Sequence, residues 1–263
     1  MEVFSVKLLK LDKSELEQMY GCILITYYST YVVFSRREGE PLRISREGHL
    51  KIRGPDRAIR PMDLVAIVPH LFRYKGCRDQ FEDKDDGILW NGIVGGYYDK
   101  LLSEQVQSQF GLIEVNFAVY RHGAEARVDV TLSDCQFLST LVYGSIIIQN
   151  SMLGEEGRSF LFNNESECIC IDAHHRDKVA QLPLSRSITV HPIGSVVTVY
   201  VKLWQRSIVG TPDQPIADGI FNFTACVSGR EVTTFRAGAC EVTVGVMWAE
   251  TKMSDESLER PYI

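Results

Sequence analysis

The amino-acid sequence predicts an all-β protein: an antiparallel β-sandwich of two sequence-related β lobes with few short helices. The first observation is that many short segments alternate apolar and polar residues, and a period of two is typical of half-buried strands. The second is that turn residues separate these segments, while no long helical period interrupts them. The third is that pieces of the first half recur in the same order in the second. The predicted lobes are residues 1–125 and 126–263, with one continuous domain as the alternative.

In the first half, alternation predicts strands over residues 3–11, 20–25, 31–34 and 112–120. Two short helices are also predicted. One covers Asp12–Met19, where Ser14 and Glu17 have the spacing of a capping box. The other covers Tyr98–Phe110 and follows a break at Gly95 and Gly96.

In the second half, strands are predicted over residues 126–132, 143–149, 167–172, 219–227 and 240–248. The clearest pattern covers Leu182–Trp204, which predicts a hairpin with its turn at His191–Gly194. Its second strand alternates over eight residues. The side chains expected to face the core are Val197, Val199, Val201 and Leu203.

The predicted duplication rests on three pairs of similar segments. A repeating unit of about 100–130 residues has the size of one sandwich lobe. The alternative is that alternating strands resemble one another without a common origin. The pairs are Tyr20–Ile25 with Tyr143–Ile148, Val68–Phe72 with Tyr200–Trp204, and Glu114–Tyr120 with Glu241–Trp248.

Composition narrows the class of protein. The chain has 263 residues, of which 45% are hydrophobic and 24% charged, and these are ordinary values for a protein with a buried core. The net charge of −6 gives no reason to expect nucleic acid as the main partner. We find no apolar run near the roughly 20 residues of a membrane span and no signal peptide. We therefore expect a cytoplasmic or nuclear location, with the seven cysteines as reduced thiols.

A basic segment is the best candidate for a binding face. Between Arg36 and Arg78 there are eleven Lys or Arg residues and five acidic residues. Such a segment could meet RNA, a ribosome or an acidic protein, while the alternative is an ordinary solvated surface. The candidate binding residues are Arg43, Arg46, Lys51, Arg53, Arg57 and Arg60.

Other groups of polar residues are better explained as exposed loops and turns than as metal or catalytic sites. The acidic run Asp79–Asp86 lacks the spacing of a calcium loop and is expected to be a solvated loop. His174 and His175 lie near Cys168 and Cys170, but adjacent strand residues point apart, so a surface turn is favoured over zinc. We expect no metal and no cofactor. The sequence contains no catalytic motif, which favours a non-enzyme, with an enzyme site assembled from distant residues as the alternative.

Seven short motifs occur along the chain in a characteristic order. They are Leu50–Ile59, Phe72–Gly76, Glu82–Asp85, Ile171–Val179, Leu184–Ser187, Leu203–Gln205 and Cys240–Trp248. Together they resemble a family known as domain of unknown function 6598, which is found in many grass proteins. The resemblance covers residues 3 to about 250, and it differs at Tyr27–Tyr31, where the family has a charged turn.

The resemblance implies no established activity. In some grass proteins a similar domain follows a ribosome-inactivating N-glycosylase domain. Glu155 and Arg158 have the helical spacing of such a toxin site, but Gly154 and Gly157 disfavour a helix, so we reject that activity. We expect a non-enzymatic binding or regulatory plant module associated with stress or defence. Its partner is expected to be a protein, with RNA or a ribosome as the alternative, and the oligomeric state stays open.

Overall fold

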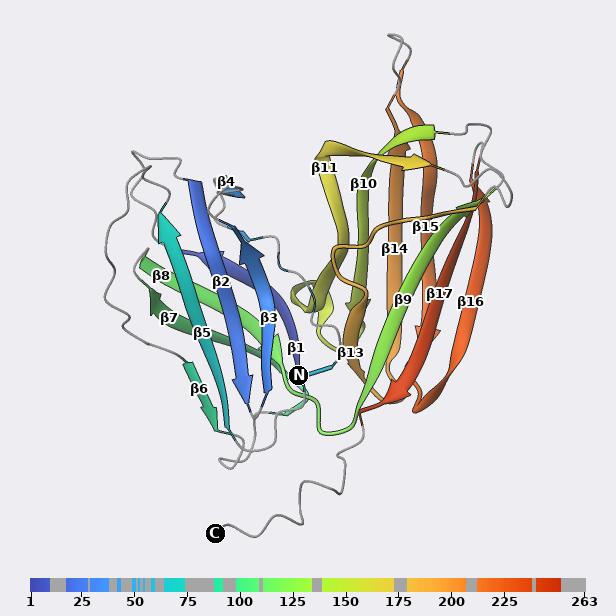
Figure 1. Ribbon diagram of the computed structural model, residues 1–263. Coiled ribbons are helices and arrows are strands. Elements are labelled where there is room, and N and C mark those ends of the chain that lie inside the picture. The colour runs from blue at the N-terminus through green and yellow to red at the C-terminus, as the bar shows by residue number, and fades with distance from the viewer. Residues whose placement is uncertain are drawn as a thin grey trace.

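The computed structural model shows two antiparallel β lobes side by side, which confirms the predicted fold class (Figure 1). No helix in the described part of the chain is long and apolar enough to cross a membrane. The structure describes residues 1–9, 18–27, 29–37, 42–43, 49–50, 52, 54, 58–59, 64–73, 88–91, 98–108, 111–133, 139–172, 179–206, 212–237 and 240–251.

The first lobe pairs a sheet of order β3-β2-β5-β6, with β4 added beside β2, with a second sheet of order β1-β8-β7. Its core is formed by apolar side chains from both sheets, among them Ile23, Phe34 and Phe117. Its strands are β1 (Glu2–Leu8), β2 (Gln18–Tyr27), β3 (Ser29–Arg36), β4 (Leu42–Arg43), β5 (Leu64–Arg73), β6 (Ile88–Asn91), β7 (Leu101–Ser108) and β8 (Gly111–Ala118).

The second lobe packs a sheet of order β11-β10-β14-β15 against one of order β12-β9-β17-β16, in which β13 also pairs with β9. A short 3-10 turn, η1 (Gly154–Gly157), precedes β11. Its strands are β9 (Gly123–Ser133), β10 (Ser139–Asn150), β11 (Arg158–Asp172), β12 (Val179–Gln181), β13 (Ile188–Pro192), β14 (Val196–Gln205), β15 (Gln214–Thr224), β16 (Ser228–Ala237) and β17 (Cys240–Glu250).

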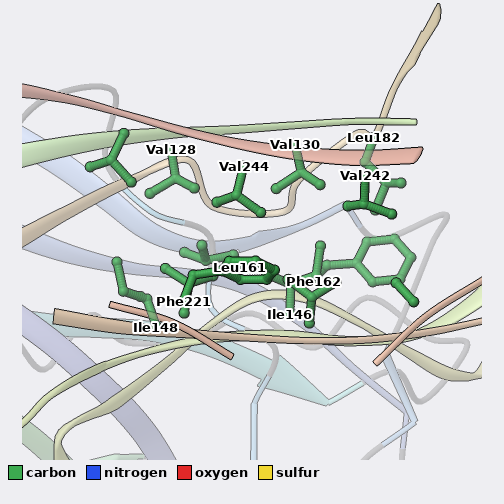
Figure 2. Close-up of a cluster of buried hydrophobic side chains, with 14 of the residues drawn as sticks. Val128, Val130, Ile146, Ile148, Leu161, Phe162, Leu182, Phe221, Val242 and Val244 are labelled. Carbon is green, nitrogen blue, oxygen red and sulfur yellow. The ribbon is translucent and has the colours of Figure 1, made fainter. Parts of the chain in front are cut away.

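The core of the second lobe lies between its two sheets. Figure 2 shows Val128, Val130 and Val244 in one layer above Ile146, Ile148 and Phe221 in the other. The alternating residues of β14 that were predicted to face the core are confirmed, since Val197, Val199, Val201 and Leu203 are at most 1% exposed. Alternation therefore located the core correctly, because only one face of each strand is buried.

The two lobes share one connectivity. Strands β1, β2, β3, β5, β6, β7 and β8 occupy the places that β9, β10, β11, β14, β15, β16 and β17 occupy in the second lobe. The registers agree as well, since Tyr20 pairs with Phe72 in the first lobe and Tyr143 pairs with Trp204 in the second. The three pairs of similar segments lie on equivalent strands, while descent from one ancestral unit stays a prediction.

The repeated Tyr-Gly dipeptide has a backbone reason. Gly21 and Gly144 both have positive φ, at 125° and 129°. A Cβ on Gly144 would lie 2.1 Å from the backbone oxygen of Lys202 on the neighbouring strand. Only glycine fits there, because the strand approaches more closely than a side chain permits.

Two sequence predictions are wrong. The helix predicted over Tyr98–Phe110 is not formed by its described residues 98–108, because Leu101–Ser108 is strand β7, an edge strand paired with β8. The predicted hairpin over Leu182–Trp204 is also incorrect. Strand β13 pairs with β9, while β14 pairs with β10 and β15, so the turn at Ile193 and Gly194 carries the chain from one sheet to the other. Two strands joined by a short turn have the same sequence pattern whether they pair with each other or lie in different sheets.

The predicted helix at Asp12–Met19 lies largely outside the described residues, and its last two residues belong to β2.

Candidate functional site

Most of the predicted basic site lies outside the described residues. Only the backbone of Arg43 is described, and it pairs with Gln18 at the edge of β2. The other five candidates, Arg46, Lys51, Arg53, Arg57 and Arg60, are not described, so the basic face stays a prediction. The acidic run 79–86 and the His174–His175 pair also lie outside the described residues.

The cysteines show one departure from expectation. Cys22, Cys168 and Cys226 are free thiols. Cys240 at the start of β17 is disulfide-bonded, so the expectation of reduced thiols is wrong there. Among the described residues, no group of three or more His, Cys, Asp or Glu side chains could hold a metal ion.

A buried ion pair joins the two lobes. Glu2 of β1 and Arg186, in the segment before β13, lie 2.6 Å apart and are 2% and 4% exposed. The Glu2 carboxylate also accepts hydrogen bonds from the Ser159 hydroxyl at 2.7 Å and the Val190 amide at 2.8 Å. The Arg186 guanidinium donates to the carbonyl oxygens of Ile188 and Val3, at 3.0 and 2.5 Å. Both charges are therefore well bonded, as a buried pair requires.

Motifs that carry the family resemblance meet at this junction. Arg186 belongs to the Leu184–Ser187 motif, and the neighbouring Ser185 hydroxyl donates to the Leu161 carbonyl at 3.0 Å. Gly54, from the Leu50–Ile59 motif, leaves room for Arg186, since a Cβ there would lie 2.3 Å from its Cγ. The Ala58 amide of the same motif donates to the Glu125 carboxylate on β9 at 2.8 Å. These motifs therefore serve to hold the lobes together.

The electrostatics of the junction reflect burial. Desolvation raises the pKa of Glu2, although the charge of Arg186 and the hydrogen bonds from Ser159 and Val190 oppose this. Desolvation, assisted by the charge of Arg186, lowers the pKa of His191 to about 3, so this ring is neutral near pH 7. Its Nε2 lies 2.9 Å from the Thr189 hydroxyl, and its Nδ1 has no hydrogen-bond partner among the described residues.

The junction has titratable groups but no room for a substrate. The hollow beside Glu2 and Arg186 is lined by apolar residues such as Ile188 and Val190, and it holds no space large enough for a water molecule. A catalytic site needs both access and groups that are free to exchange protons. We therefore interpret this cluster as a structural clamp between the lobes.

A second feature lies on the solvent side of the β11-β10-β14-β15 sheet. Phe160 pairs with Ile147, Ile147 with Tyr200, and Tyr200 with Ile220, so four apolar or aromatic side chains cross the whole sheet. Phe160 is 43% exposed and Ile220 is 64% exposed, while Ile147 and Tyr200 are half-buried. We call these four residues the apolar row.

A β-bulge creates one end of the apolar row. The register between β10 and β11 shifts between Ile146 and Ile147, which lets Leu161 and Phe162 both point into the core. Phe160 is thereby turned outward, opposite Ile147. Bulges commonly re-aim side chains in this way.

Polar rows flank the apolar row on both sides. One is Asn163, Ser145, Lys202 and Asp218. The other is Arg158, Gln149, Thr198 and Asn222. Arg158 donates to Gln149 at 3.0 Å, forms an ion pair with Glu155 at 3.1 Å, and lies 5.9 Å from the centre of the Tyr200 ring. An apolar centre with a polar rim is the anatomy of a protein interface.

The outer face of the opposite sheet is different in character. Its exposed positions include Arg127, Arg230 and Arg236, and Arg230 lies 3.8 Å from Asp129. Met247 is an exposed apolar side chain there, but its cross-strand neighbours are Arg127 and Arg230. The continuous apolar row therefore distinguishes one of the two sheets.

The sequence contained a signal for the apolar row that was not used. Ile147, Phe160 and Ile220 are apolar at positions of their strands that should alternate to polar if the outer face were only solvated. Single exposed apolar residues are ordinary, so the row becomes visible only when the strand registers place them side by side.

The fold and surface define a class: an all-β protein of two sandwich lobes, clamped by a buried ion pair and carrying an exposed apolar sheet face. Within this class, the chain belongs to the family described as Domain of unknown function (DUF6598), whose profile matches residues 1–246. No curated protein and no solved structure matches the chain.

Proposed function

We propose that the chain is a non-enzymatic binding module of a plant protein, and that the apolar row is its docking surface for another protein. The observation that carries the proposal is the apolar row itself, four strands wide and exposed at both ends. Contiguous exposed apolar patches with polar rims are typical of protein interaction sites. The buried Glu2–Arg186 pair at the lobe junction, in contrast, is engaged in holding the fold.

A site-specific photo-crosslinker tests this proposal. A benzophenone side chain at position 220 should form a crosslink to a protein in extract of the native tissue. The same probe at position 247, on the opposite sheet, should not. Adding Phe160→Glu to the protein with the probe at 220 should abolish the crosslink, because a charge would be buried at one end of the contact. Equal crosslinking from both positions, or none from position 220, would contradict the proposal.

The basic segment supports a second candidate function, an accessory protein of RNA or the ribosome. Its support is the excess of eleven basic over five acidic residues between Arg36 and Arg78. Such contacts weaken with salt because binding releases counterions. The test is co-sedimentation with ribosomes at low and moderate salt, compared with a variant in which Arg43, Arg46, Lys51 and Arg53 are reversed in charge. Failure to co-sediment even at low salt would exclude this function.

A further inference from the structure

We infer that the occupant of the apolar row is a second copy of this chain, packed face to face about a two-fold axis. The inference rests on the proposed docking role of the row and names the partner. Closed two-fold dimers are the commonest assemblies of soluble proteins, and their interfaces must be self-complementary. The question is therefore whether this face complements itself.

Self-complementarity first requires that apolar side chains meet apolar side chains. The apolar row meets this requirement whether the two-fold axis runs parallel or perpendicular to the strands. With the two-fold axis parallel to the strands, β10 lies over β14 of the other copy, so Ile147 meets Tyr200 and Phe160 meets Ile220. With the axis perpendicular to the strands and centred on the row, each member of the row meets its own copy. Both arrangements place apolar on apolar.

Self-complementarity also requires that like charges do not meet, and the polar rows on both sides of the apolar row satisfy this. With the axis parallel to the strands, Lys202 meets Ser145, Asp218 meets Asn163, and Arg158 meets Asn222. With the perpendicular axis, Lys202 meets Thr198, Arg158 meets Asn163, and Asp218 meets Asn222. Within these two polar rows no like charges meet in either arrangement, and each charged side chain faces a neutral hydrogen-bonding group. Avoidance of like-charge contacts is what specificity in an interface demands.

The size of the face is sufficient for a dimer. Four strands about 4.8 Å apart and about 27 Å of strand from Val196 to Trp204 give a flat footprint of about 500 Å². Two copies packed face to face would together cover about 1,000 Å², which is the lower bound for a specific interface. On the outer face of the opposite sheet, Val232 pairs with Gly245, and Met247 lies between Arg127 and Arg230. The exposed apolar side chains described there therefore do not form a row across the strands.

Sedimentation velocity of the purified chain over a wide concentration range tests the inference. The wild type should show a monomer–dimer equilibrium. Ile220→Asp should weaken dimerisation by roughly 100-fold or more, because each dimer would bury two unpaired carboxylates. The matched control is Met247→Asp, which makes the same kind of change at a 47% exposed position of the opposite sheet. It should leave dimerisation unchanged.

Thermal unfolding by circular dichroism accompanies both variants. Ile220 is 64% exposed, so its replacement should leave the fold intact. A wild type that stays monomeric at the highest concentration would overturn the inference, as would a dimer that Ile220→Asp leaves unaffected. If the wild type is monomeric while position 220 still crosslinks to a different protein, the dimer is refuted and the proposed docking function stands.

Discussion

The clamp between the lobes makes the sharpest prediction. Replacing Arg186 with methionine keeps most of the side-chain volume but leaves the Glu2 carboxylate buried without its cation. It also removes the donor to the Ile188 and Val3 carbonyls. Removing one partner of a buried ion pair lowers the free energy of unfolding by about 3–5 kcal/mol. We expect a loss of this size in the free energy of unfolding, measured by urea or thermal denaturation.

The pH dependence of this loss identifies its cause. The pKa of Glu2 is raised in the folded protein, so burial of its charge costs stability above the folded pKa and nothing below the unfolded pKa. Without Arg186 that pKa rises further, because the charge that lowered it is gone. The difference in stability between wild type and Arg186→Met should therefore shrink as the pH falls from neutral toward 4.

The control is a double variant, Glu2→Met with Arg186→Met. It removes both charges and should recover much of the lost stability, because apolar replacement of a whole buried pair is often neutral. The reasoning would be refuted if Arg186→Met cost under about 1 kcal/mol, or if the loss were independent of pH.

Three further predictions concern other residues. The pKa of His191 is lowered to about 3 in the folded protein, so its ring stays neutral there, whereas the same side chain in the unfolded chain gains a proton below about pH 6.5. This difference should lower the free energy of unfolding by about 2 kcal/mol between pH 7 and 5, and His191→Phe should lose less over that range in urea titrations. Gly54→Ala should lower the free energy of unfolding by about 1–3 kcal/mol in the same assay, because the new methyl group would collide with Arg186. Ala58→Gly is the control for the general sensitivity of this segment to substitution. Cys240 should resist alkylation in denaturant until a reductant is added, while Cys168 and Cys226 are modified without one; peptide mass spectrometry distinguishes these outcomes.

The sequence predicted what depends on local pattern. Alternation located the strands and the buried face of β14, because one side of that strand meets the core. It could not separate a hairpin from a crossing between sheets, because β13 and β14 are joined by a short turn in either case. The strand β7 was predicted as a helix. It lies at the edge of its sheet with few buried side chains, so its sequence does not have to alternate between apolar and polar residues.

The candidate sites could not be predicted in the same way, because both depend on residues distant in sequence. Glu2 and Arg186 are 184 positions apart, and nothing local to either indicates an ion pair. The apolar row depends on three strand registers and one bulge. The basic segment was visible because its residues are close in sequence, but proximity in sequence says little about whether side chains converge.

The comparison between lobes sharpens the case for the second lobe as the binding lobe. In the first lobe, Val32 pairs with Leu24, and Leu24 pairs with Val68, on the strands equivalent to β11, β10 and β14. The bulge recurs there between Ile23 and Leu24, and Val33 and Phe34 both point inward as Leu161 and Phe162 do.

The same architecture thus builds an outward apolar row in both lobes, so the bulge alone does not make a binding site. What differs is the set of side chains placed on it. The first lobe carries aliphatic groups, whereas the second carries Phe160 and Tyr200 and extends to Ile220 on a fourth strand. Aromatic side chains supply more contact area and are enriched where binding energy concentrates. Since the junction motifs hold the lobes together through Glu2 and Arg186, we expect the row, and not the clamp, to set binding specificity.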